Sequence, residues 1–341
     1  MRIVVTGANG FIGTELISQL IQDETYEVHA IDRRADRPFP LSCFQFGSQI
    51  EARAVFHKTD LCDRDAISSM IEDIRPDWIF HLAAESHVDN SIHDPVSCIT
   101  NNIIGSAHLL DSAKKYFSSM SKAGQKRFRF LFVSTDEIYG SLDKNQAPVS
   151  EQAKFKTSSP YSASKAAGNH LAEAWGRTYG LPIITTQCTN NYGSGQHPEK
   201  LIPRMVAKAI AAEELPIFGD GKQIRDWIHV SDHVAALIAL MSRGPKTGSF
   251  NIGASSELQN IQIASRICSF LDEIVPKSTG SYLDQITFIR DRPGHDTRYA
   301  LNWEKVHDVI GWRPVISIEN GLRQTVEWYV KNQSQMLKLA V

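Results

Sequence analysis

Apolar runs and amphipathic segments alternate regularly through the first half of the chain. Short apolar runs at 3–6, 27–32, 54–59, 78–82 and 130–134 predict strands. Amphipathic segments predict helices over 11–20, from Asp63 as N-cap through 74, and over 162–179. Such alternation predicts a parallel sheet with helices on both faces. Ligands bind at the carboxyl ends of strands in such sheets, so chemistry is expected after Leu82 and after Val133.

The second half of the chain has a different pattern. Beyond Cys188 the regular alternation is lost, and residues 190–203 and 218–227 are rich in polar and turn residues. This half is therefore predicted to be a smaller lobe built on connections from the first. Residues 118–126 are the most linker-like segment and are predicted to form a surface loop between a helix and the strand at 130.

A glycine-rich segment, Gly7-Ala8-Asn9-Gly10-Phe11-Ile12-Gly13, connects the first predicted strand to the first predicted helix. Glycines there permit a tight turn and close approach to a pyrophosphate, and the helix N-terminus favours the phosphate charge. Asp32 ends the second strand, about 20 residues on, as a dinucleotide site requires. The alternative is a structural turn without a ligand, because 21 glycines produce such spacings by chance.

These features predict a doubly wound (Rossmann) α/β fold with a mostly parallel sheet and a smaller, interleaved C-terminal lobe. We predict an NAD-binding domain over 1–189 and a substrate-binding lobe over 190–341, some segments of which return to the sheet. Asp32 favours NAD because it bonds the ribose hydroxyls, although Arg33 or Arg34 would accommodate the 2′-phosphate of NADP. Cofactor contacts are expected from these residues: Gly7, Asn9, Gly10, Phe11, Ile12, Gly13, Asp32, Asp60, Leu61, Ala83, Tyr161 and Lys165. For Asp60 a helix-capping role is the alternative.

Composition narrows the function classes. The 341 residues are 42% hydrophobic and 22% charged with a net charge of -2, so no overall charge favours nucleic acid or an anionic membrane. No apolar run reaches the roughly 20 residues of a membrane-spanning helix. The first strand begins at once and leaves no room for a signal peptide. Five scattered cysteines indicate reduced thiols in a cytoplasm, and neither cysteines nor histidines have metal-ligand spacing, so no metal is predicted.

Two groups of residues indicate acid–base chemistry. Tyr161 and Lys165 are four apart at the start of a predicted helix and share one face, where an ammonium would lower the pKa of a phenol. Asp136 and Glu137 follow the strand at 130. A helix N-cap with a first-turn acid is the structural alternative for this pair. The functional interpretation is a second acid and base beside the tyrosine.

At these residues the chain resembles the dTDP-glucose 4,6-dehydratase family of extended short-chain dehydrogenase/reductases, over nearly its whole length. The matching segments are GANGFIG at 7–13, HLAAESHVD at 81–89, STDEIYG at 134–140, YSASK at 161–165, NNYG at 190–193, PEKLIP at 198–203, GDG at 219–221 with RDW at 225–227, NIG at 251–253 and RPGHD at 292–296, ending at Arg298-Tyr299. Decarboxylase relatives carry Thr-Ser-Glu in place of Thr135-Asp136-Glu137, and epimerases lack the acid pair.

The resemblance implies a reaction cycle and a homodimer. Tyr161, with Lys165 beside it, takes the proton of the sugar O4 while C4 gives hydride to NAD, and Thr135 hydrogen-bonds near O4. Glu137 removes the C5 proton, Asp136 protonates the C6 hydroxyl, and the hydride returns to C6. The dimer would form through helices that include residues 162–179. Substrate contacts are implied for Glu85, Ser86, Asn190, Lys200, Leu201, Arg225, Asn260 and Tyr299.

Alternatives and departures remain. Glu85 and Ser86 also fit a buried, satisfied polar pair, and Arg225 also fits a surface salt bridge. The family often has an aromatic-rich stretch where this chain has Ser194-Gly195-Gln196-His197, and a less basic sequence where it has Arg33-Arg34. The predicted function is a nucleotide-sugar 4,6-dehydratase acting on dTDP-glucose or UDP-glucose. The alternative is an epimerase or decarboxylase on the same scaffold, or a cofactor-sensing binding protein without chemistry.

Overall fold

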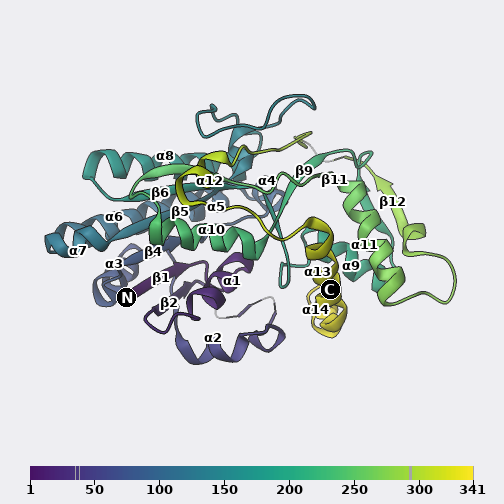
Figure 1. Cartoon of the computed structure of the whole chain (residues 1–341), viewed down its shortest axis with the longest axis horizontal. Coiled ribbons are helices and arrows are strands. Elements are labelled where there is room, and N and C mark those ends of the chain that lie inside the picture. Colours follow the sequence, from purple (N-terminus) through teal and green to yellow (C-terminus); the bar gives the residue numbers. More distant parts are fainter. Residues whose placement is uncertain (35, 38, 292–293, 341) are drawn as a thin grey trace.

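A parallel sheet forms the left-hand part of the molecule in Figure 1. The computed structural model describes residues 1–34, 36–37, 39–291 and 294–340. Within these residues the sheet has seven strands in the order β10-β6-β5-β4-β1-β2-β3, and every neighbouring pair is parallel. The strands are β1 (Arg2–Thr6), β2 (Glu27–Asp32), β3 (Ala54–Lys58), β4 (Trp78–His81), β5 (Arg129–Thr135), β6 (Ile183–Cys188) and β10 (Gly248–Ile252).

The predicted doubly wound α/β class is confirmed by this order. The chain runs outward from β1 through β2 to β3, then returns to β4 on the other side of β1. The point where the direction changes therefore lies between β1 and β4, which is where such sheets bind their ligands. β1 and β4 are buried almost throughout, and apolar runs such as Ile3-Val4-Val5 suit a strand covered on both faces.

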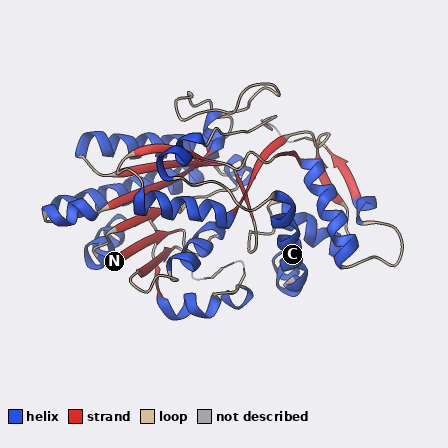
Figure 2. Ribbon diagram, viewed as in Figure 1, coloured by secondary structure: helices blue, strands red, loops and turns tan. Residues whose placement is uncertain are grey.

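Helices cover both faces of the sheet, as Figure 2 shows. One face is packed by apolar residues of α1 (Phe11–Leu20), α10 (Val230–Arg243) and α12 (Glu304–Ile310). The other face is packed by α3 (Arg64–Ile74), α6 (Gly105–Ser119) and α8 (Pro160–Tyr179). Both α10 and β10 come from the second half of the chain. The boundary at 189/190 remains a prediction.

Local signals explain where two of these helices begin and end. Asp63 caps α3, and its carboxylate accepts a hydrogen bond from the backbone N–H of Ala66. Ser159 caps α8 in a capping box, Pro160 follows at the first helical position, and Gly180 ends the helix in the left-handed conformation. The start of α8 is therefore fixed locally, and Tyr161 lies in its first turn.

A smaller lobe lies at the right of Figure 1. Its strands β7 (Asn190–Tyr192), β9 (Ile224–His229) and β11 (Glu257–Gln259) form one sheet, and β8 (Leu215–Phe218) pairs with β12 (Ile286–Ile289). Its helices are α9 (Leu201–Ile210), α11 (Asn260–Ile274), α13 (Ile318–Lys331) and α14 (Gln333–Ala340). These elements share a second apolar core that includes Val206, Ile267 and Tyr329.

Shorter elements complete the described chain. They are η1 (Leu41–Cys43), α2 (Gly47–Arg53), α4 (Val88–His93), α5 (Pro95–Ile99), η2 (Thr100–Ile104), α7 (Lys122–Arg127), η3 (Asp136–Tyr139) and η4 (Tyr282–Gln285). The loop predicted at 118–126 is wrong: α6 runs to Ser119, and α7 begins after Ser121, whose hydroxyl accepts from the N–H of Gly124. A serine N-cap outweighs the polar composition of this segment.

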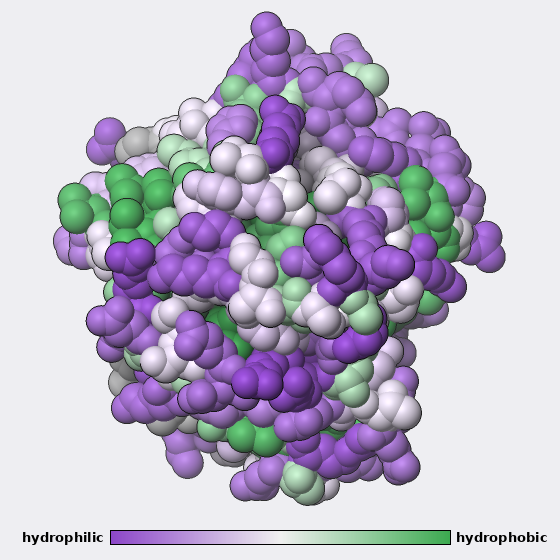
Figure 3. All heavy atoms as spheres, turned by 90° about the vertical axis from the view of Figure 1, so that its left-hand side faces the viewer, coloured by the Kyte–Doolittle hydropathy of each residue, from purple (hydrophilic) through white to green (hydrophobic). Residues whose placement is uncertain are grey.

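The surface seen from the left of Figure 1 is predominantly hydrophilic, with hydrophobic atoms in small separate patches (Figure 3). Among the described residues, no helix combines the length and the apolar character that crossing a membrane requires. Arg292 and Pro293, which carry part of the resemblance, lie outside the described residues.

Candidate active site

A large pocket opens at the carboxyl edge of the sheet, where β1, β4 and β5 end. Most of the predicted site residues line it, from both halves of the chain. They are Gly7, Gly10, Phe11, Ile12, Gly13, Asp32, Asp60, Leu61, Ala83, Glu85, Ser86, Thr135, Asp136, Glu137, Tyr161, Lys165, Asn190 and Lys200. The fold thus brings together residues that are up to 193 positions apart, from Gly7 to Lys200.

The glycine turn after β1 has no room for a side chain at Gly7 or at Gly13. Gly7 has φ 71°, and a Cβ there would lie 2.8 Å from the backbone nitrogen of Ala83. A Cβ on Gly13 would lie 2.2 Å from the carbonyl oxygen of Gly7. The first glycine therefore permits close approach to the β4 loop, and the last permits the helix to start against the turn. The residues form a cradle that suits a pyrophosphate at the N-terminus of α1.

Asp32 lies beside this turn and is held by backbone N–H groups. Its carboxylate accepts hydrogen bonds from the N–H of Asn9 and of Arg34, each at 3.0 Å. Asn9, a predicted cofactor contact, is not among the residues that line the pocket. Its side chain donates to the carbonyl oxygen of Arg34 and accepts from Nε of Arg37. Asn9 therefore supports the loop after β2, and its backbone N–H orients Asp32.

The two acids after β5 lie in a short helical turn. Thr135 precedes it, and its hydroxyl accepts from the N–H of Glu137 at 3.3 Å and donates to Oδ1 of Asp136 at 3.2 Å. The N-cap that the sequence left as a structural alternative is therefore present together with the acid pair. Asp136 is 4% exposed, whereas Glu137 is only partly buried. The structural cap places both carboxyl groups at the pocket.

Burial gives Asp136 an unusual protonation state. Loss of solvent raises the pKa of Asp136 well above its ordinary value, the charge of Glu137 raises it further, and Arg225 opposes both. Its Oδ2 atom is buried and has no hydrogen-bond partner in the described structure. Burial therefore favours the protonated form of this carboxyl group, which is the form that can donate a proton into the pocket.

Tyr161 and Lys165 both line the pocket from the first turns of α8, but the predicted electrostatic relation between them is wrong for this conformation. Burial raises the pKa of Tyr161 well above its ordinary value, Glu137 and Cys188 add to the increase, and Thr135 opposes it. Lys165 instead donates to the carbonyl oxygen of Val133 at 2.7 Å. Burial lowers the pKa of Lys165 to about 8. Desolvation is the largest cause of both pKa shifts.

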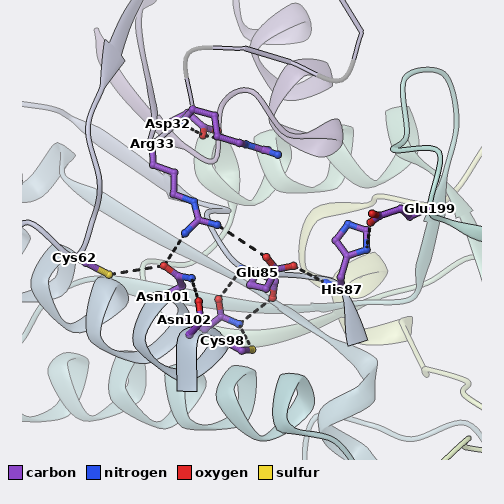
Figure 4. A network of polar contacts seen from close by, with 11 residues as sticks. Asp32, Arg33, Cys62, Glu85, His87, Cys98, Asn101, Asn102 and Glu199 are labelled. Carbon is purple, nitrogen blue, oxygen red and sulfur yellow. Dashed lines mark hydrogen bonds and ion pairs between the residues drawn. The ribbon is translucent and has the colours of Figure 1, made fainter. Parts of the chain in front are cut away.

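A polar network crosses the pocket between the ends of β2 and β4 (Figure 4). The amide of Asn102 accepts from the N–H of Glu85 at 2.7 Å and donates to its carbonyl oxygen at 3.0 Å. Arg33 donates to Oδ1 of Asn101 at 2.9 Å and has its other guanidinium nitrogen 4.0 Å from a carboxylate oxygen of Glu85. These contacts fix the backbone at Glu85 and link it to the loop after Asp32.

Sequence reasoning missed the asparagines of this network. Asn101 and Asn102 lie in η2, a π-helical turn between α5 and α6, which is a local geometry found frequently at functional sites. No sequence pattern marks such a turn. Other pocket residues that were not predicted are Thr59, Leu82, Ala84, His87, Ser134, Cys188, Thr189, Asn191, Gln196 and His197.

His87, His197 and Lys200 line the pocket, and Glu199 lies beside the two histidines. We call these four residues the outer end of the pocket. Nδ1 of His87 lies 2.9 Å from a carboxylate oxygen of Glu199, and Nδ1 of His197 lies 3.6 Å from the same oxygen. Lys200 donates to the carbonyl oxygen of Ser86 at 2.8 Å. Burial, then the charge of Lys200, lowers the pKa of His87 to about 4, against the effect of Glu199. Two loops therefore meet here through polar contacts.

Four predicted substrate residues do not line this pocket: Leu201, Arg225, Asn260 and Tyr299. Arg225 is 5% exposed, lies over the ring of Tyr299, and donates to the carbonyl oxygens of Ile224 and Asp296. Its alternative as a surface salt bridge is wrong, because the side chain is buried. The first residue of α9 is Leu201, and the first of α11 is Asn260. These residues belong to the smaller lobe, and their predicted roles are not tested by this geometry.

Comparison with known proteins identifies the family. The family model described as GDP-mannose 4,6 dehydratase matches residues 4–325. The chain belongs to this family. It is 45% identical to the dTDP-glucose 4,6-dehydratase of Haemophilus influenzae, an alignment that covers 98% of this chain and 99% of the relative.

Solved structures within this family have the same fold. The structure of dTDP-glucose 4,6-dehydratase from Bacillus anthracis in complex with NAD is 34% identical, has a TM-score of 0.85, and is aligned over 99% of each chain. UDP-glucose 4-epimerase from Thermotoga maritima, solved with UDP-glucose, is 29% identical with a TM-score of 0.83, over 97% of this chain and 99% of that one. The resemblance inferred from the sequence motifs is confirmed.

Proposed function

We propose that this chain is an NAD-dependent nucleotide-sugar 4,6-dehydratase, a lyase that converts dTDP-glucose to its 4-keto-6-deoxy product. The curated relatives named above as dTDP-glucose 4,6-dehydratases support this activity. The observation that carries the proposal is the state of Asp136. It is a buried carboxyl group with a raised pKa and an unpartnered oxygen, and it lies next to Glu137 and in the same pocket as Tyr161.

The residues of the pocket fit an NAD molecule. Gly7 and Gly13 let the turn pack tightly against the β4 loop and the start of α1, because a Cβ at either position would collide with backbone atoms. This tight turn at the N-terminus of α1 suits a pyrophosphate. Asp32 lies at the end of β2, where it would bond the adenosine ribose. A bound NAD would supply an acceptor for the hydride from C4 of the sugar and a donor for its return to C6, and its positive charge would favour the phenolate form of Tyr161.

The chain's own groups would move three protons. Tyr161 takes the proton of the sugar O4, and Thr135 holds that oxygen. Glu137, the less buried acid, removes the proton from C5. Asp136 donates its proton to the departing C6 hydroxyl, for which a raised pKa is required. Lys165 donates to the carbonyl oxygen of Val133 and lines the same pocket as the tyrosine.

The substrate would extend from Thr135 toward the smaller lobe. Glu85, Ser86, Asn190 and Lys200 line its path. For Arg225 to bind the diphosphate, as the resemblance implies, its guanidinium has to exchange its contacts with backbone carbonyls for phosphate oxygens. We assign Leu201, Asn260 and Tyr299 to the nucleotide end on the same basis.

An epimerase or decarboxylase is the second candidate, because the UDP-glucose 4-epimerase structure matches this fold closely. An epimerase oxidises C4 but eliminates no water, so it has no use for a neutral carboxyl group at Asp136. The alternative therefore explains Tyr161 and the glycine turn, and leaves the protonated acid without a role.

A side-by-side assay of purified protein with dTDP-glucose and UDP-glucose tests the function. We expect a product lighter than the substrate by one water, without net consumption of NAD, and faster turnover with the dTDP-linked sugar. A product of unchanged mass from both substrates would establish the epimerase instead. Loss of carbon dioxide from a uronic acid substrate would establish the decarboxylase.

We also propose a homodimer through α4, α5, η2 and α8. Ile92, Val96 and Ile99 are 45%, 71% and 42% exposed on elements next to α8, and a buried helix pair between two copies would cover them. Val96→Glu should shift the protein to a monomer in light scattering, whereas Val315→Glu, at a site 76% exposed elsewhere, should not.

All five cysteines are unpaired thiols, which supports a reducing cytoplasm as the location.

A further inference from the structure

Two loops meet at the outer end of the pocket with a set of nitrogen and oxygen atoms that the dehydratase chemistry does not use. His87 comes from the loop after β4, and His197 and Glu199 come from the loop between β7 and α9. Each contributes one atom, and the three atoms all lie within 4.8 Å of one another. Figure 4 shows the imidazole of His87 in contact with the carboxylate of Glu199.

We propose that His87, His197 and Glu199 form a binding site for a divalent transition-metal ion such as Zn²⁺. Two imidazoles and one carboxylate are a ligand set that zinc accepts, with a fourth position open to water. Hard cations such as Mg²⁺ and Ca²⁺ prefer oxygen ligands and fit this set poorly. The spacing in sequence is not that of a local metal motif, so only the fold reveals the group.

The distances fit a site that closes on the metal. The two histidine nitrogens lie 2.9 Å and 3.6 Å from one oxygen of Glu199. Ligands about 2.0–2.1 Å from zinc in a tetrahedron lie roughly 3.3 Å apart, so small side-chain rotations satisfy all three bonds. The rings of His87 and His197 have centroids 5.5 Å apart and lie edge to face.

Two features of the surroundings bear on metal binding, namely the solvent exposure of the three ligand side chains and the charges near them. The side chains of His87, His197 and Glu199 are 22%, 32% and 56% exposed, so an ion can reach the site from solvent. Lys200 and Arg34 add positive charge near the histidines, whereas Glu85 and Asp89 add negative charge. These charges of opposite sign largely offset each other, and the ligand set decides whether an ion binds.

A bound metal would join the two loops across the mouth of the pocket. The segment that carries His197 and Glu199 continues into Lys200, which already donates to the carbonyl oxygen of Ser86. A metal bridge to His87, the next residue after Ser86, would hold this contact closed. We therefore expect metal binding to slow substrate access, which makes the ion an inhibitor of the enzyme.

Direct titration tests the site without reference to activity. Protein stripped with EDTA should bind one Zn²⁺ per chain in calorimetry, and Co²⁺ should give the visible absorption of a four-coordinate site. His197→Gln and His87→Gln should each weaken binding by more than about 10-fold. His307→Gln, at an exposed histidine on α12, is the matched control and should bind as the unaltered protein does. Equal affinity in all four proteins, or no binding, would overturn the proposal.

A second measurement tests the consequence. Turnover of the proposed substrate should be highest with EDTA and should fall as Zn²⁺ occupies the site, and the His197→Gln variant should require a higher Zn²⁺ concentration for the same fractional loss. Stoichiometric binding with unchanged turnover would refute the closure of the loops. Because the titration needs neither substrate nor NAD, failure of the dehydratase assignment would leave its result intact.

Discussion

The inner and outer ends of the same pocket differ in what controls their chemistry. At the inner end, Asp136, Tyr161 and Lys165 are buried, and desolvation is the largest cause of each pKa shift. At the outer end, Arg33, His197 and Glu199 are partly exposed and interact through ion pairs and single hydrogen bonds. Burial therefore controls the protonation of groups at the inner end, whereas contacts at the outer end can exchange with solvent or ligands.

This difference assigns separate tasks to the two ends. A proton donor has to keep its proton until the reaction requires it, which burial of Asp136 ensures. Residues that admit a substrate have to release their contacts at low cost. Substitutions at the inner end should therefore change chemistry by large factors, and substitutions at the outer end should change binding slightly. The following predictions test this contrast.

Tyr161→Phe should have the largest effect. The substitution removes the phenol that takes the O4 proton and leaves the ring, so turnover should fall by about 10²- to 10⁴-fold. Retention of NAD, measured by absorbance of the nucleotide released on denaturation, should not change. Near-normal turnover in this variant would show that another group is the base.

Glu137→Gln should separate oxidation from water loss. The amide keeps the shape of the side chain but cannot remove the C5 proton, so the C4 ketone and NADH should accumulate with little dehydration. Stopped-flow absorbance of NADH and the mass of the product measure the two steps. If water is still lost at the normal rate, Glu137 is not the C5 base.

Asp136→Asn should raise stability while it lowers activity. Because the folded pKa of Asp136 is raised, the native state keeps a proton that the unfolded state releases above about pH 4, and stability falls as pH rises toward the folded pKa. The asparagine variant has no titratable group at position 136, so its free energy of unfolding does not fall with pH for this reason. It should be more stable by roughly 0.5–2 kcal/mol at pH 7, and this gain should vanish at pH 3.5.

Urea unfolding of both proteins at the two pH values measures this effect. A stability difference that is independent of pH would mean that Asp136 is ionised in the native enzyme. The general-acid role would then lose its physical basis, even if the variant were inactive.

Arg33→Ala should have the smallest effect. Arg33 is 45% exposed and makes one hydrogen bond and one 4.0 Å ion pair, so its loss should change the free energy of NAD binding by less than about 1 kcal/mol. Calorimetry on cofactor-free protein measures the change. A loss of affinity greater than tenfold would show that this contact at the mouth of the pocket is not readily exchanged.

Much of the framework follows from local sequence. The glycines at 10 and 13 and the caps Asp63 and Ser159 each depend on neighbours within a few residues. Predicted strands and helices of the first half therefore agree with the structure to within one or two residues. The error at 118–126 has the same origin, because a short capped helix and a polar loop have similar composition.

What the tertiary structure decided depends on desolvation and on contacts between distant segments. The sequence places Asp136 beside Glu137, but only burial in the fold raises the pKa of Asp136 and of Tyr161. The same holds for His87 and His197, which are 110 positions apart and share Glu199. Residue spacing along the chain determines which chemical groups are available. The solvent and partners around each group, which only the fold supplies, determine the state in which that group acts.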